Sequence, residues 1–178
     1  MFMLKFSGHF APIYEAYLRF FLLIAALITP VQALALSCAP WHVENAYQRA
    51  AESGERYVVV NGTLTFNEDA LPKVDFDRQE DTPRETHIDA VLTGNSMSLT
   101  GFNRKFKRTV SLVIKCFGPW CSTASTDTPT LAFLKRGEDA FELVADPCSA
   151  MLFQNPEKDH IRRVLNCFSG GKCAAPSR

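Results

Sequence analysis

Residues 57–66, Tyr-Val-Val-Val-Asn-Gly-Thr-Leu-Thr-Phe, form the stretch of the chain that most strongly determines its fold. β-Branched and aromatic residues dominate it, which is typical of a β-strand. Asn61-Gly62 in the middle is compatible with a tight turn between two short strands or with a bulge in one long, bent strand. Because each flanking run has only about four residues, we favour one long strand that bulges at Gly62.

The segments around this strand predict a mainly β domain with a helix near each end. Trp41 to Ser53 has an apolar helical face, followed by Gly54 as a stop signal. Near the other end, Asn155-Pro156-Glu157 predicts the start of a helix with Asn155 as its cap, and Gly170-Gly171 predicts its end. Further strands are expected at 86–92, 109–116, 131–135 and 140–145, the last two as a hairpin.

Short strands with irregular connections favour a small closed or half-open barrel of about five strands with flanking N- and C-terminal helices, and a sandwich is the alternative. Residues 67–85 are polar and acidic and contain proline, so we expect a long loop. Three large aromatic residues are interpreted as core, or as packing around disulfides: Trp41, Phe117 and Trp120.

The first 35 residues have the pattern of a secretory signal peptide. The apolar run 20–28 follows Arg19, and Ala33-Leu34-Ala35 supplies small residues for cleavage. This run is too short to span a bilayer, which takes about 20 residues. We therefore expect a secreted or periplasmic protein without an integral membrane segment after cleavage. A lipidated Cys38 is the alternative, but it would leave an odd number of cysteines.

Cleavage after Ala35 would leave residues 36–178 as a single domain that keeps all six cysteines. In an oxidising compartment such cysteines form disulfides by default. The segment around Cys116 and Cys121 contains no histidine, so it is a poor zinc site. We expect neither a metal nor another cofactor.

The formal net charge of zero conceals a segregation of charge along the chain. Zero net charge removes the long-range attraction of a general nucleic-acid binder. Residues 67–89 have a balance of −5, whereas residues 90–126 contain five bases and no acid. This basic stretch is either a docking site for an anionic partner or, more commonly, a solvated strand edge whose charges prevent edge-to-edge pairing. The clustered bases are Arg104, Lys105, Lys107 and Arg108.

The start of the mature chain resembles a known family. Cys38-Ala39-Pro40-Trp41-His42, followed by Ala46-Tyr47 and Ala50, resembles the tissue inhibitors of metalloproteinases and the wider netrin-like modules. Cys121, residues 131–134, Gly137 and Asp146-Pro147-Cys148 look like a second part of the family pattern. The resemblance covers most of residues 36–173 and implies an OB-fold barrel with a C-terminal helix.

The resemblance also implies a disulfide pairing. It pairs Cys38 with Cys148, while the family's first and third cysteines fall on Leu36 and near Gln48. The partners of those two missing cysteines correspond to Cys121 and Cys167, and each has another cysteine nearby. We therefore expect three disulfides: Cys38–Cys148, Cys116–Cys121 and Cys167–Cys173.

Three functions are compatible with these patterns. The first is an exported binding module for a protein or anionic glycan partner. The second, implied by the resemblance, is a protease inhibitor in which the amine and carbonyl of Leu36 chelate the protease zinc and Ser37 enters its specificity pocket. The missing first cysteine weakens this second hypothesis, because Leu36 is not preorganised.

The third function is a small enzyme that uses His87 and Asp89, which share one face of a predicted strand. His42 is expected instead to cap or pack near the first helix. The sequence contains no nucleophile motif and no phosphate-binding loop, so we do not expect an enzyme.

Overall fold

Residues 57–66 form one continuous strand, β1 (Tyr57–Phe66), in a computed structural model that describes residues 37–138 and 140–176. One edge of β1 pairs antiparallel with β2 (Glu85–Ser98), and the other edge pairs antiparallel with β5 (Thr128–Arg136). The prediction of one long strand is confirmed. The expected leader, residues 1–35, and Leu36 lie outside the described residues.

The expected bulge at Gly62 is wrong, because both ladders of β1 run through Asn61-Gly62 without a shift in register. Gly62 instead lies directly opposite Gly94 of β2. A Cβ atom built at Gly62 would overlap the carbonyl oxygen of Thr93 and lie 2.8 Å from the Cα of Gly94. Glycine is therefore needed here for close approach of two backbones, not for an unusual dihedral angle.

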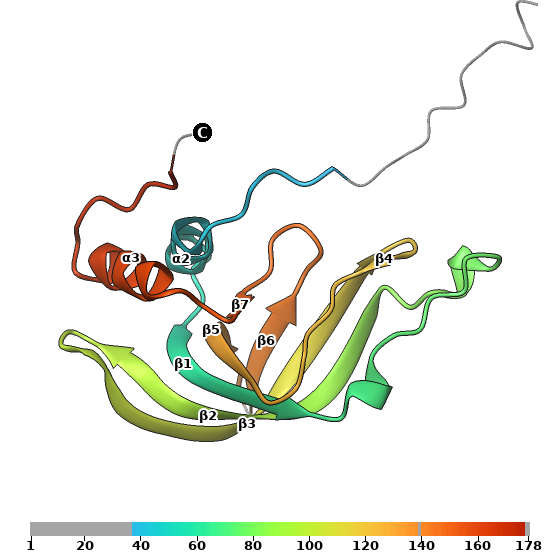
Figure 1. Cartoon of the computed structure of the whole chain (residues 1–178), viewed down its shortest axis with the longest axis horizontal. Helices are drawn as coiled ribbons and strands as arrows, with labels where there is room; N and C mark the ends of the chain where they lie inside the picture. Colours follow the sequence, from blue (N-terminus) through green and yellow to red (C-terminus); the bar gives the residue numbers. More distant parts are fainter. Residues whose placement is uncertain (1–36, 139, 177–178) are drawn as a thin grey trace, which may run out of the picture. The chain divides into compact units, whose positions relative to one another are not determined.

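Five strands form a closed ring of pairings (Figure 1). β2 pairs with β3 (Gly101–Phe117), β3 pairs in parallel with β6 (Phe141–Ala145), and β6 pairs with β5, which returns to β1. Two short strands lie outside the ring: β4 (Trp120–Cys121), paired with β3, and β7 (Leu152–Gln154), paired with β5. The mainly β class and the antiparallel pairing of the last two expected strands, 131–135 and 140–145, are confirmed.

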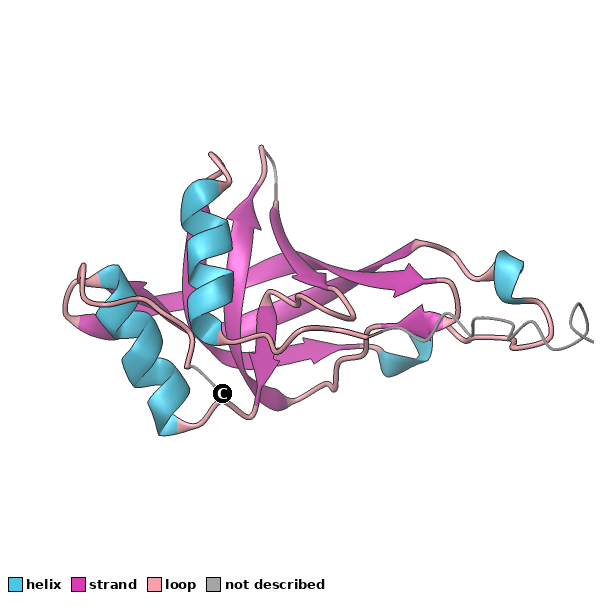
Figure 2. Ribbon diagram, turned by 90° about the horizontal axis from the view of Figure 1, so that it is seen from above, coloured by secondary structure: helices cyan, strands magenta, loops and turns pink. Residues whose placement is uncertain are grey.

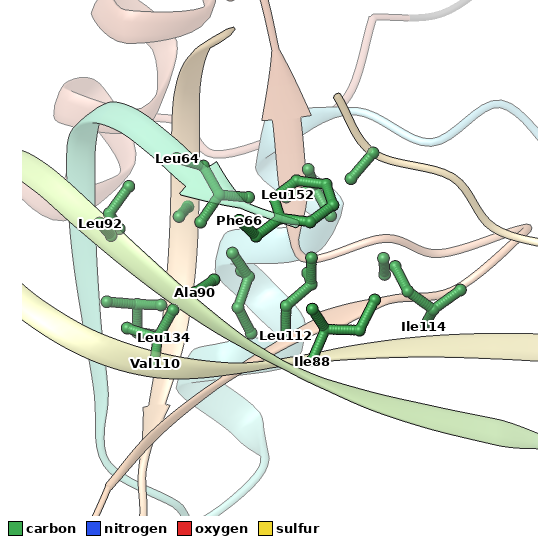
Figure 3. Packing of buried hydrophobic residues seen from close by; sticks show 14 of the residues in the cluster. Leu64, Phe66, Ile88, Ala90, Leu92, Val110, Leu112, Ile114, Leu134 and Leu152 are labelled. Atoms are coloured by element: carbon green, nitrogen blue, oxygen red, sulfur yellow. The ribbon is translucent and has the colours of Figure 1, made fainter. Parts of the chain in front are cut away.

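The ring encloses one hydrophobic cluster, and a second cluster lies on its outer face. Both clusters contain residues of β1 and β5. Side chains alternate between the two faces of a strand, so Val60 and Leu134 belong to the inner cluster while Val59 and Phe133 belong to the outer one. Figure 3 shows the inner cluster. Its labelled members are Leu64, Phe66, Ile88, Ala90, Leu92, Val110, Leu112, Ile114, Leu134 and Leu152.

Two helices cover the outer cluster: α2 (Val43–Glu52) and α3 (Lys158–Phe168), which pack side by side (Figure 2). The Arg163 guanidinium of α3 makes hydrogen bonds of 2.9 and 3.0 Å to the two carboxylate oxygens of Glu44 in α2. Glu44 is only 3% exposed. Removing Arg163 would leave the buried Glu44 carboxylate without its partner, so this ion pair constrains how the helices meet.

The helix caps differ partly from the prediction. His42 is the N-cap of α2, and its backbone N–H donates to the Asn45 side chain at 3.0 Å. Glu157, not Asn155, is the N-cap of α3, and its backbone N–H donates to Nδ1 of His160 at 3.1 Å. Asn155 precedes the helix with a φ of 50°, a left-handed conformation that asparagine tolerates.

The second and third strands are longer than expected. Residues 93–103, which the sequence analysis did not assign, continue β2 and begin β3, with a turn between Ser98 and Gly101. The expected loop from Asn67 to Arg84 contains two short 3₁₀ helices, η1 (Glu68–Ala70) and η2 (Gln79–Asp81).

The structure contains the three expected disulfides: Cys38–Cys148, which the resemblance implies, and the two short-range pairs Cys116–Cys121 and Cys167–Cys173. In the chain-entropy model, the loop of about 110 residues closed by the first contributes about 5 kcal/mol, against about 2 kcal/mol for the two short loops. Cys38–Cys148 is therefore the disulfide on which stability depends most.

We predict that Gly62→Ala destabilises the protein by about 2 kcal/mol or more, because the added methyl group must separate the backbones of β1 and β2. Chemical denaturation measures the change in the free energy of unfolding. The neighbouring Thr63→Ala variant is the control, with an expected loss below about 1 kcal/mol. Equal stability of the two variants would contradict the close approach of Gly62 and Gly94.

Candidate binding surface

The first half of β3 carries the clustered bases, and we call its residues 103–109 the basic arm. β3 pairs with β2 from Arg104 to Thr109, with a shift in register at Asn103, but its pairing with β6 begins only at Val110 opposite Phe141. All residues of the basic arm are exposed except the half-buried Phe106. The arm is therefore a strand with a neighbour on one side only.

Strand alternation divides the four predicted bases between two faces of the sheet. Lys105 and Lys107 lie on one face, and Arg104 and Arg108 lie on the other. Arg108 is opposite Leu92, so its face is the one that continues into the inner cluster. The basic stretch thus surrounds the free edge of β3 instead of forming one flat patch.

Phe106 anchors the basic arm to the rest of the ring. Its ring packs edge-to-face against Phe141, the first residue of β6, with centroids 5.4 Å apart. Phe106 also packs against the inner cluster. This contact lies next to the position at which β3 begins to pair with β6. Apolar side chains therefore border the free edge of β3 at that end.

A groove of about 540 Å³ lies beside this contact and extends to the turn between β5 and β6. Three bases line it: Lys105, Arg108 and Arg136. Two acids, Asp89 and Glu138, line it as well. Among the lining residues that the structure describes, bases therefore outnumber acids by one.

The chain that follows Leu36 is held against the loop between β6 and β7. Besides the disulfide from Cys38 to Cys148, the indole Nε1 of Trp41 donates to the carbonyl oxygen of Ala150 at 2.8 Å. Arg49 lies over the Trp41 ring, 4.9 Å from its centroid, and donates to Oγ of Ser149 at 2.6 Å. Ser37 and Cys38 are exposed, so this anchored end of the described chain is accessible.

The structure does not pair His87 with Asp89. Both side chains are exposed on β2, but Nδ1 of His87 lies 3.3 Å from Oγ of Ser111, and its Nε2 lies 3.8 Å from a carboxylate oxygen of Glu85. No hydrogen bond joins His87 to Asp89 in the described chain. An exposed His–Glu contact of this kind is typical of a surface ion pair.

Two further surfaces were not predicted. An apolar pocket of about 370 Å³ is lined mainly by Tyr47, Tyr57, Met97 and Phe168, and burial raises the pKa of Tyr57 there. Its lining comes from four different elements, so no local pattern in the sequence could indicate it.

The second is the turn between β3 and β4, where Phe117 and Trp120 are 42% and 43% exposed. Neither is therefore a core residue, and both adjoin the Cys116–Cys121 disulfide, which was the other expectation for them; Trp41 is half-buried. The pattern Cys-Phe-Gly-Pro-Trp-Cys could have indicated a short turn that displays aromatic rings, because glycine and proline favour a turn.

Within the described residues, no group of three or more histidine, cysteine, aspartate or glutamate side chains could hold a metal ion. Neither α2 nor α3 has the length and apolar character that a membrane-spanning helix needs.

Comparisons of the chain with protein-family models, with curated proteins and with solved structures find no match.

Proposed function

We propose that the protein is an exported, disulfide-stabilised binding module of the netrin-like, OB type, and that its basic arm binds an acidic protein or an anionic glycan. The observation that carries the proposal is the basic arm itself. Four bases lie within five exposed or half-buried residues around a free strand edge, and the stretch from 90 to 126 has no acid to neutralise them.

The topology and the cysteines support the netrin-like, OB-type part of the proposal. The ring has the order β1-β2-β3-β6-β5, is closed by β1–β5, and has a single parallel pair, β3–β6. The resemblance implies that Cys38 pairs with Cys148, and the structure has this disulfide. Where the family's third cysteine falls, the Gln48 side chain donates to the carbonyl oxygen of Cys173 at 2.6 Å. A hydrogen bond thus joins α2 to the C-terminal loop at this position.

Export is supported by two independent features. The first 35 residues have the pattern of a secretory leader. All six cysteines are paired in disulfides, which persist in oxidising compartments and are rare in the cytosol.

We predict that neutralising the arm with Arg104→Gln, Lys105→Gln, Lys107→Gln and Arg108→Gln weakens binding of a heparin-derived octasaccharide at least about tenfold, since several favourable charge pairs are lost. Isothermal titration calorimetry measures the affinity, which salt should weaken by screening. The control neutralises four exposed bases elsewhere: Arg56, Lys73, Lys158 and Lys172. An equal loss in both variants, or no binding by the wild type, would contradict recognition of an anionic glycan by the arm.

Inhibition of a protease by the mature N-terminus is the second candidate function. The anchoring of Cys38 and Trp41 to the loop between β6 and β7 favours it, because a rigid N-terminal segment binds with less loss of conformational entropy. In this hypothesis the free amine and carbonyl of Leu36 would chelate the protease zinc, and Ser37 would occupy the adjacent pocket.

This second hypothesis predicts inhibition that depends on a free Leu36. The mature protein should inhibit at least one member of a panel of zinc proteases, and one extra N-terminal alanine should abolish the inhibition because it displaces the chelating amine. Residual peptidase activity provides the measurement. Equal inhibition by the two forms, or inhibition by neither, would exclude zinc chelation.

A further inference from the structure

We infer that residues 105–109 of β3 are a strand-addition site, at which an extended acidic peptide pairs with the free edge of the basic arm. This inference rests on the proposed function and deepens it, because it states the class of partner and the way the arm holds it. Its basis is the direction of the backbone groups along β3 and the charge on both sides of them.

Two hydrogen bonds near the end of β3 establish which way its backbone groups point. The N–H of Cys116 donates to the carbonyl oxygen of Arg84, on the β2 side, at 2.9 Å. The carbonyl of Lys115 accepts from the N–H of Ser122, on the opposite side, also at 2.9 Å. Successive residues of a strand direct their N–H and C=O groups to opposite edges.

The same alternation holds along the basic arm, because the register between β2 and β3 does not shift from Glu85 opposite Lys115 to Ser96 opposite Arg104. Lys107 is eight residues before Lys115, so its backbone groups face away from β2. Those of Lys105 and Thr109 face the same way. β6 pairs with β3 only from Val110 onward, so these three residues present strand hydrogen-bonding groups to an edge without a neighbouring strand.

The backbone carbonyl of Lys107, on the free edge, has a hydrogen-bond partner within the unbound protein. It accepts a hydrogen bond of 2.9 Å from the guanidinium of the adjacent Arg108, which is exposed. A peptide N–H could replace this local bond and release Arg108 to pair with a carboxylate. Strand addition uses main-chain hydrogen bonds for affinity and side chains for specificity.

The charge around the edge selects an acidic peptide. Lys105 and Lys107 flank the edge on one face, and Arg104 and Arg108 flank it on the other, so acidic side chains of an added strand would meet bases on both faces. An apolar side chain would fit next to Phe106 and Phe141. A second copy of this arm is disfavoured by like charges, which is how edge lysines prevent self-pairing.

The experiment compares Lys107→Pro with Lys107→Ala. Both remove the same charge, but only proline removes the N–H that faces the free edge. Proline is tolerated on an edge strand where its nitrogen faces solvent. The probes are a fluorescein-labelled octapeptide of alternating glutamate and valine, measured by fluorescence anisotropy, and the heparin-derived octasaccharide, which has charge but no strand backbone.

We expect Lys107→Pro to bind the peptide at least tenfold more weakly than Lys107→Ala, and both variants to bind the octasaccharide equally. Equal peptide affinity in the two variants would overturn the inference. Thermal melting shows whether Lys107→Pro is folded. If Lys107→Pro is not folded, the wild-type protein is tested instead with the same peptide in which every backbone amide is methylated. Strand addition predicts that methylation weakens binding, and undiminished binding of the methylated peptide would overturn the inference.

The octasaccharide separates this inference from the proposed function. If the wild type binds the octasaccharide but not the peptide, the arm recognises a glycan and the inference is wrong while the proposed function stands. If it binds neither probe, both are wrong.

Discussion

The fold depends on the fact that β1 pairs along both of its edges. It joins β2 on one side and β5 on the other, and this closes the ring. Closure requires the backbones of β1 and β2 to approach where Gly62 faces Gly94, since a side chain at either position would collide with the facing strand. Closure also places apolar side chains against both faces of β1 and β5. One face contributes to the interior of the ring, and the other supports the two helices.

The free edge of β3 is a consequence of this closure. β3 has 17 residues, whereas its partner β6 has five and pairs only with residues 110–114. The remaining part of β3 is extended and paired with β2, so it is ordered as a strand without being enclosed. Bases occupy this part and acids are absent from it, which protects the edge from pairing with another copy. The same bases are those that we propose to bind an anionic partner.

Local patterns predicted the elements whose residues are strongly periodic or β-branched, namely β1, both helices and the β5–β6 hairpin. They missed residues 93–98 at the end of β2, whose glycine and hydroxyl groups form a strand because β3 and, up to Ser96, β1 pair with them. They also misassigned Gly62 as a bulge, because a glycine needed for close approach cannot be distinguished from a bulge without its neighbour. The cluster of bases was visible in the sequence. The division of these bases between two faces, and the free edge between them, could not be predicted from the sequence. Both depend on the register of β3 with β2 and on the position at which β6 begins.

Amide hydrogen exchange of the unliganded protein, measured by NMR, tests the central claim most directly. If β3 pairs with β2 alone along the basic arm, protection must alternate. The amides of Phe106 and Arg108, which face β2, should exchange slowly, while those of Lys105 and Lys107, which face the free edge, should exchange fast. In β1, successive amides from Val60 to Leu64 should all be protected, because strands flank both edges there. Equal protection of Lys105 and Phe106, or alternating protection between Val60 and Leu64, would contradict the ring and its free edge.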